Sequence, residues 1–141
     1  MAEIPTSVRQ NLQTSARRAE GLVRSRSYPQ WFEFCAQQLQ AAASLPDNWD
    51  SYGGLQTNSL SAVHASIFLE ELARTVSVPQ PMIAVNANGN VCFEWDTARW
   101  LMTVEITPRG VAKYYYEHGN EEIESTDTGS FHTIIQLLTR L

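Results

Sequence analysis

The side chains that most often perform catalysis or bind metals are few in this sequence. It contains three histidines and two cysteines: His64, His118, His132, Cys35 and Cys92. None of them stands at the HxH, HExxH or CxxC spacing of zinc sites, so we expect no metal and no cofactor. A nucleophilic pair of Cys92 and His118 requires both to face the same side of a sheet, which the predicted strands allow. Cysteine is more commonly a small buried apolar residue.

Three carboxylates, Glu94, Glu105 and Glu117, recur along predicted strands and share one face of the sheet. Paired carboxylates can perform acid–base catalysis when they are desolvated. A solvated strand face explains them more simply. Gly53 and Gly54 lack the partners of a phosphate-binding loop. The sequence therefore predicts a protein that is not an enzyme.

Residues 45–54, LPDNWDSYGG, combine turn-forming residues with two large aromatic ones. The polar side chains can bond the downstream backbone, and Asp50 can accept bonds from loop amides. We interpret Trp49 and Tyr52 as buried anchors that fasten a long connection to the core. The alternative interpretation is that both rings are exposed beside Asp50 and form a partner-binding spot.

The same stretch resembles a segment, L-P-x-x-W-D-x-Y-G, found in functionally uncharacterised small bacterial and phage proteins. In that group a helix, a Pro-containing linker and a short antiparallel sheet follow the segment, as we expect for residues 45–117. The matching positions are Leu45, Pro46, Trp49, Asp50, Tyr52 and Gly53. The resemblance implies a mobile-element or accessory-gene setting and no particular reaction.

Charge is distributed unevenly along the chain. The net charge is −5, but residues 1–27 carry a formal +3, so the remainder carries −8. An acidic body argues against broad phosphate binding, which needs clustered cations. The N-terminal arginines could still contact nucleic acid, although a solvated helix face is the simpler explanation. The four that we assign to this alternative are Arg9, Arg17, Arg18 and Arg24.

Composition and length favour one cytoplasmic domain. A chain of 141 residues suits a single domain, residues 1–141, with a helical part over 1–78 and a sheet plus last helix over 82–141. Two cysteines are too few for a disulfide framework, so we expect free thiols. The N-terminus has no apolar signal segment. No run approaches the roughly 18 apolar residues that a membrane span needs.

Periodicity near 3.6 predicts helices over residues 4–25, 29–43 and 58–77. In the third helix Asn58 or Ser59 is the expected cap, and Glu70 and Glu71 are expected to face away from the core. The apolar stripe of the second helix is Trp31, Phe34, Cys35, Leu39 and Ala42. That of the third is Ala65, Phe68, Leu69, Leu72 and Val76.

After residue 81 the period changes to two, which predicts an antiparallel meander. Asn88-Gly89 predicts a two-residue hairpin, a loop over 96–99 pairs Trp95 with Trp100, and the turn over 107–110 pairs Glu105 with Lys113. A short charged fifth strand is expected over 121–126. A last helix, capped by Thr128 or Ser130, has the apolar side Phe131, Ile134, Ile135, Leu138 and Leu141.

The predicted fold class is therefore α+β, with N-terminal helices, a four- to five-stranded antiparallel meander and a C-terminal helix. If the helices cover the tryptophan face, the other face of the sheet stays open. We predict a non-enzymatic protein-binding regulator or inhibitor that occupies a partner protein, with homodimerisation as a further possibility. The alternative is a nucleic-acid-binding regulator that uses the N-terminal arginine-bearing helix. The predicted contact residues are Tyr115, Leu101, Glu94, Glu105, Trp49, Asp50 and Tyr52.

Overall fold

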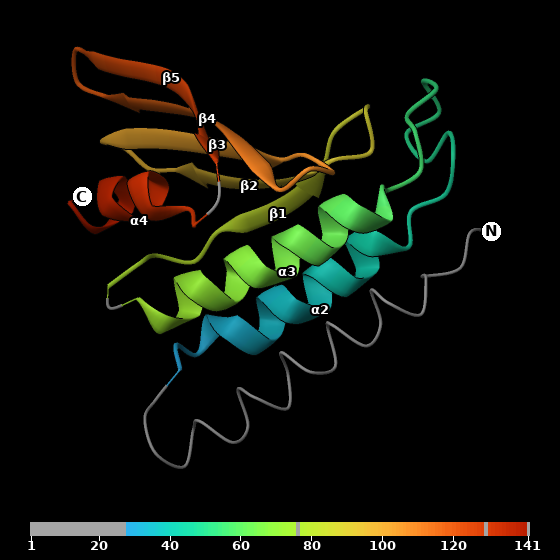
Figure 1. The fold of residues 1–141 in the computed structure, drawn as a ribbon, viewed down its shortest axis with the longest axis horizontal. Helices are drawn as coiled ribbons and strands as arrows, with labels where there is room; N and C mark the ends of the chain where they lie inside the picture. Colours follow the sequence, from blue (N-terminus) through green and yellow to red (C-terminus); the bar gives the residue numbers. More distant parts are fainter. Residues whose placement is uncertain (1–27, 76, 129, 141) are drawn as a thin grey trace.

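The computed structural model describes residues 28–75, 77–128 and 130–140, and this part of the chain has the predicted α+β fold (Figure 1). Its helices are α2 (Trp31–Ala43), α3 (Ser59–Arg74) and α4 (His132–Thr139). Its strands are β1 (Met82–Val85), β2 (Val91–Asp96), β3 (Trp100–Ile106), β4 (Val111–His118) and β5 (Glu121–Thr128). The predicted helix over 4–25, with its arginines, lies outside the described residues, as do Val76 and Leu141.

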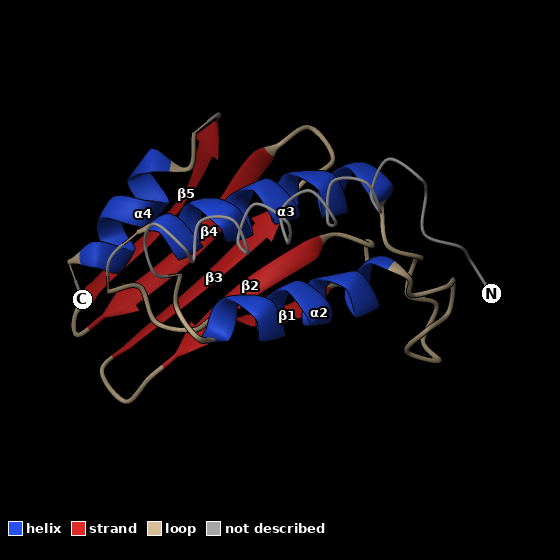
Figure 2. Ribbon diagram, turned by 90° about the horizontal axis from the view of Figure 1, so that it is seen from below, coloured by secondary structure: helices blue, strands red, loops and turns tan. Residues whose placement is uncertain are grey.

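The five strands form one antiparallel sheet in chain order, and the three described helices lie on one of its faces (Figure 2). Alternate side chains of the central strands point toward these helices and are buried. They are Val91, Phe93, Trp95, Met102, Val104, Ile106, Tyr114 and Tyr116. Trp95 and Trp100 share this covered face, as predicted, with Trp100 partly buried against the core. The Phe68 ring centroid lies 4.8 Å from those of Phe93 and Phe131.

Helix α3 begins at the predicted cap and packs against β2 and β3. The Asn58 Oδ1 atom accepts hydrogen bonds from the backbone N–H groups of Leu60 (2.9 Å) and Ser61 (3.2 Å). These two donors have no partner within the helix, so the cap satisfies them. The small residues Ser61, Ala62 and Ala65 then allow the helix to approach the strands closely.

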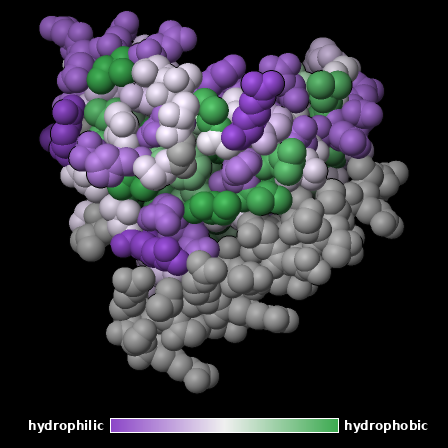
Figure 3. Space-filling view, in the orientation of Figure 1, coloured by the Kyte–Doolittle hydropathy of each residue, from purple (hydrophilic) through white to green (hydrophobic). Residues whose placement is uncertain are grey.

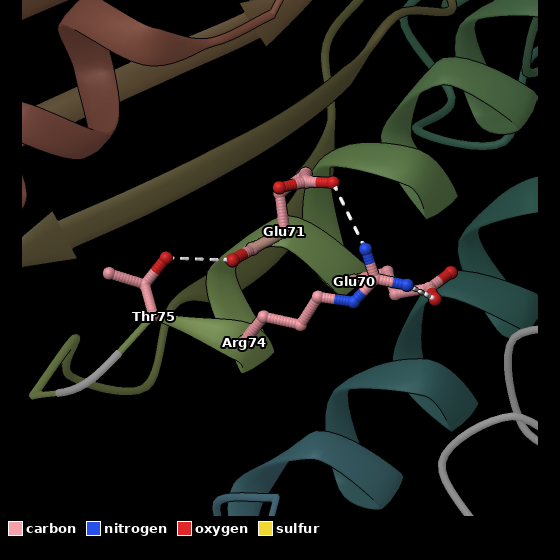
Figure 4. Close-up of polar contacts among 4 residues, drawn as sticks. All are labelled: Glu70, Glu71, Arg74 and Thr75. Atoms are coloured by element: carbon pink, nitrogen blue, oxygen red, sulfur yellow. Dashed lines mark hydrogen bonds and ion pairs between the residues drawn. The ribbon is translucent and has the colours of Figure 1, made fainter. Parts of the chain in front are cut away.

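Glu70 does not face away from the protein, so that prediction was wrong. Its side chain lies between α3 and α2, and the residue is only 7% exposed. Its Oε1 atom pairs with Arg74 Nη2 at 2.6 Å, and Arg74 also reaches Glu71 at 3.4 Å (Figure 4). A carboxylate can be buried here because a cation one helical turn away neutralises it.

The predicted stripe of α2 was also wrong at one position. Phe34 is 53% exposed, whereas Phe32, which was not assigned to the stripe, is buried. The buried positions Phe32, Cys35, Leu39 and Ala42 follow helical spacing, and Phe34 lies one residue outside that line. The pattern alone did not show which of the two phenylalanines faced the core.

Two loops of the sheet differ in length from the prediction. Between β1 and β2 the loop has three residues, since Asn86 N–H donates to the Asn90 carbonyl and Gly89, with φ +81°, occupies the left-handed bulge position. Asn86 Oδ1 fixes the longer loop by accepting from the backbone N–H groups of Asn88 and Asn90, each at 3.1 Å. Between β2 and β3 the loop is Ala98-Arg99, because the Thr97 backbone N–H donates to the Trp100 carbonyl at 2.9 Å.

The register of β2 and β3 consequently differs from the prediction by two residues. Trp95 pairs with Met102, and Phe93 pairs with Val104. A shift of two leaves every side chain on its predicted face, whereas a shift of one would have exchanged the faces. The turn over residues 107–110 is confirmed, with Glu105 opposite Lys113.

The last helix is capped differently from the prediction. Neither Thr128 nor Ser130 caps it; Asp127 Oδ2 accepts from the N–H groups of Thr133 (3.0 Å) and Ile134 (3.3 Å). Phe131 stands at the N-cap position with φ +59° and is buried. An end-of-strand carboxylate therefore connects β5 to α4. No helix within the described residues is long and apolar enough to span a bilayer.

Candidate functional site

The sheet face opposite the helices is the first candidate site, and no helix or strand of the described residues covers it (Figure 1). Three rows of side chains cross it from β2 to β5. They are Cys92, Glu105, Lys113 and Thr126; then Glu94, Thr103, Tyr115 and Glu124; then Asp96, Leu101, Glu117 and Glu122. We call these twelve residues the outer face. It bears six carboxylates and one lysine, so it is strongly acidic.

Four predicted contact residues meet on the outer face: Tyr115, Leu101, Glu94 and Glu105. Leu101, Thr103 and Tyr115 are half-buried; Thr103 and Tyr115 lie in the middle row and Leu101 in the last row, with carboxylates around them. An open hollow of about 510 Å³ lies between Tyr115, Glu105, Lys113 and Glu124. Hydrophilic residues predominate in Figure 3 at the upper left, where Figure 1 places β4 and β5.

Glu105 is committed to internal contacts more than the other carboxylates. Its Oε2 atom accepts hydrogen bonds from the side-chain amides of Asn86 (2.7 Å) and Asn90 (2.8 Å). Partial burial opposes its ionised form, but the bonds from Asn90 and Asn86, together with the Lys113 charge, lower its pKa below the ordinary value. Glu105 therefore holds the β1–β2 hairpin against the sheet.

Tyr115 is half-buried on the outer face, and its hydroxyl is held in place. The hydroxyl donates to Glu117 Oε2 at 3.0 Å. This bond, then desolvation and the charges of Glu117 and Glu122, raise the pKa of Tyr115 to about 12. The ring is thus oriented and neutral, as suits a contact residue rather than an acid–base catalyst.

Cys92 and His118 do not form a nucleophilic pair, contrary to the arrangement that the predicted strands allowed. Cys92 belongs to the outer face, but His118 pairs with Trp100, whose side chain is on the covered face. Burial, followed by the charges of Glu105 and Glu94, raises the pKa of the Cys92 thiol to about 12. Such a thiol is protonated at neutral pH and is a poor nucleophile.

Residues 45–57 form the second candidate site, a loop whose polar side chains bond its own backbone. Asp50 Oδ1 accepts from the N–H groups of Tyr52 (3.0 Å) and Gly54 (2.9 Å), which confirms the role predicted for it. Asn48 Oδ1 accepts from Gly53 N–H at 2.8 Å. These bonds hold a backbone in which Asn48 and Ser51 both have positive φ.

The rings of this loop are not both buried anchors, so the favoured interpretation was wrong for Tyr52. Tyr52 is 93% exposed, and Trp49 is half-buried with its indole N–H donating to the Leu55 carbonyl at 2.9 Å. The loop is fastened by its backbone instead, through Leu55 N–H to the Ala87 carbonyl (2.9 Å). An aromatic anchor in the core was therefore unnecessary, and Tyr52 remains available to a partner.

Replacing Asp50 with asparagine should lower the melting temperature at neutral pH, because a neutral amide oxygen is a weaker acceptor for two backbone N–H groups. The N–H bonds from Tyr52 and Gly54 hold the pKa of Asp50 below its ordinary value of 3.8. A depressed carboxyl pKa stabilises the fold above the unfolded-state pKa, and that contribution disappears as the pH falls through the folded-state pKa.

The measurement is thermal unfolding followed by circular dichroism across a pH series. The difference in melting temperature between the wild type and Asp50→Asn should narrow below about pH 4. Asp47→Asn is a useful control, because Asp47 accepts only one bond, from Gln56 N–H at 2.9 Å. A difference for Asp50→Asn that stays constant into acid would show that its charge does not stabilise the loop.

Two outer-face residues escaped the sequence interpretation. Glu122 and Glu124 were recognised only as part of a charged edge strand, yet they face Glu117 and Tyr115 directly. The signal was the Gly119-Asn120 turn, whose two-residue length places Glu121 opposite His118 and sets this register. Within the described ranges, no three His, Cys, Asp or Glu side chains are grouped so that they could hold a metal ion.

Comparison with known proteins identifies no relative of this chain. No family model matches the chain. No curated protein matches it. No solved structure matches it. The arguments for function therefore rest on the geometry of the outer face and of the loop.

Proposed function

We propose that this protein is a non-enzymatic regulator or inhibitor that occupies a partner protein, as an antitoxin, an immunity protein or a phage anti-defence protein does. The observation that carries the proposal is the outer face, a sheet surface that no described element covers. Half-buried Leu101 and Tyr115 lie on its two inner strands, β3 and β4, and carboxylates flank them. An apolar centre with a polar rim is the usual anatomy of a protein interface.

The charge of the outer face indicates the kind of partner. Six carboxylates against one lysine repel phosphate and attract a basic protein surface. Exposed Tyr52, on a loop already held rigid by Asp50 and Asn48, is proposed as a second contact. A preorganised aromatic side chain loses little conformational entropy on binding.

The setting of this function is proposed on two grounds. Cys35 and Cys92 are free and buried, which is consistent with a reducing compartment such as the cytoplasm. The resemblance of residues 45–117 to small phage and bacterial proteins supports an accessory-gene role, such as anti-defence.

The test is capture of a partner from the native host with a tagged protein. The wild type should retain a stoichiometric protein, and Glu94→Lys combined with Glu124→Lys should lose at least about 90% of it, because like charges would then meet at the interface. The control is Glu33→Lys, an exposed position on α2 that changes the charge as much as each of the two outer-face substitutions does. Folding of each variant is checked by circular dichroism.

Two results would refute the proposal. One is a wild-type protein that captures nothing in stoichiometric amount. The other is a captured protein whose amount is the same for the outer-face double variant and for Glu33→Lys.

A further inference from the structure

The free edge of β5 is a surface distinct from the outer face. Edge strands are usually short, carry charged side chains, or are interrupted by proline or a bulge, which prevents pairing with other chains. Strand β5 has eight residues, contains no proline, and pairs with β4 without interruption from His118–Glu121 to Val111–Thr128. Helix α4 contacts β5 from the covered face and leaves its outer edge free among the described residues (Figure 2).

The register shows which backbone groups point outward from this edge. A two-residue hairpin makes His118 and Glu121 a hydrogen-bonded pair, and the bonded pairs alternate from there. The N–H and C=O groups of Glu122, Glu124 and Thr126 therefore point away from β4. A strand added here would find a regular row of donors and acceptors.

Charge argues against a second copy of this chain as the occupant. Strand β5 carries four carboxylates, those of Glu121, Glu122, Glu124 and Asp127, and no cation. Pairing two copies of β5 would bring eight carboxylates together, which like-charge repulsion disfavours. The same charges favour a strand with cationic side chains, especially next to Glu122 and Glu124 on the outer face.

We propose that an extended segment with lysine or arginine at alternate positions adds to β5 as a sixth strand. Its cations lie against Glu122 and Glu124, and the residues between them point to the covered face beside half-buried Ile123. Apolar residues suit those positions, because they extend the core at its edge. This inference rests on the proposed function, since it names the kind of partner that the acidic surface receives, by strand addition.

The probe is a fluorescein-labelled peptide of alternating lysine and valine, about eight residues long, the length of an ordinary strand. Fluorescence anisotropy should show binding to the wild type. The same peptide N-methylated at its lysine amides keeps its charge but cannot pair, so it should bind at least about tenfold more weakly, the equivalent of about 1.4 kcal/mol. A peptide with the lysines and valines in separate blocks controls for charge alone.

On the protein side, Thr126→Pro removes one outward N–H without removing a bond to β4, because Thr126 and Lys113 form a non-bonded pair. Thr126→Pro should weaken binding of the unmodified peptide about tenfold. Thr126→Ala, which keeps the N–H, should leave that affinity unchanged. Amide chemical shifts of residues 122–126 should move on binding. If Thr126→Pro does not fold, the test is the affinity of the wild type for the N-methylated peptide compared with its affinity for the unmodified peptide.

Equal affinity for the methylated and unmodified peptides, or no binding at all, would overturn this proposal. Shifts confined to Leu101 and Tyr115 would also overturn it while leaving the proposed function standing. A dimer in sedimentation that Thr126→Pro dissociates would identify a second copy as the occupant instead. If the peptide pairs with the edge of β5 but no partner is captured from the host, the proposed function is contradicted. The proposal of strand addition to β5 then still stands.

Discussion

Gly89→Ala should destabilise the protein by about 2–4 kcal/mol, the sum of a left-handed backbone cost and a steric one. Gly89 has φ +81°, and a Cβ there would collide with the backbone carbonyl oxygen of Gln56. That carbonyl cannot move freely, because the neighbouring Thr57 N–H donates to the Leu45 carbonyl at 3.2 Å. The collision would separate the loop from the β1–β2 hairpin.

Equilibrium urea unfolding measures the effect, and Gly119→Ala is its matched control. Gly119 also has positive φ, at +61°, but a Cβ there has nothing within 4 Å. It should therefore cost only the conformational part, about 1–2 kcal/mol. Equal losses at Gly89 and Gly119 would mean that contact between loop and hairpin contributes nothing to stability.

Ser61→Ala should cost about 1–3 kcal/mol, because it removes two buried hydrogen bonds. The Ser61 hydroxyl donates to the Ile106 carbonyl at 2.6 Å and accepts from the Val91 N–H at 2.9 Å. Ser61 is fully buried, so water does not readily replace it. One side chain of α3 thus connects the ends of β2 and β3.

The control is Ser66→Ala on the same helix. The Ser66 hydroxyl is also buried but donates only to the carbonyl of Val63, at 2.7 Å within the helix. Its removal should cost about 1 kcal/mol or less. Hydrogen exchange of the Val91 amide gives a second measurement, and exchange should accelerate in Ser61→Ala. Equal losses of unfolding free energy in Ser61→Ala and Ser66→Ala would contradict the bridging role of Ser61.

These two contacts bear on the candidate sites because they hold them in position. Gly89 joins the loop that presents Tyr52 to the hairpin, whose asparagines Asn86 and Asn90 donate to Glu105 on the outer face. The loop and the outer face are therefore linked through one hairpin. A destabilised Gly89 variant is expected to weaken partner capture as well, so binding variants should be chosen away from this junction.

The covered and open faces of the sheet could be predicted from the sequence, because period-two alternation assigns each strand residue to a face regardless of its exact partner. Trp95 and Trp100 are on the same side although their register was misassigned by two residues. The 107–110 turn was predicted correctly since Pro108 and Gly110 each suit a single turn position. Asn58 was predicted as a cap by the same local chemistry.

Other features depend on contacts between residues distant in the sequence, and only the tertiary structure decided them. Local periodicity could not choose Phe32 over Phe34, because that choice depends on how α2 meets α3. It could not show that Tyr52 is exposed, because backbone bonds to the β1–β2 hairpin replaced the expected aromatic anchor. The sequence by itself determined which residues share each face of the sheet, through alternation. Packing decided which polar side chains stay free on the open face, because the hydrogen-bond partners of Glu105 come from the β1–β2 loop.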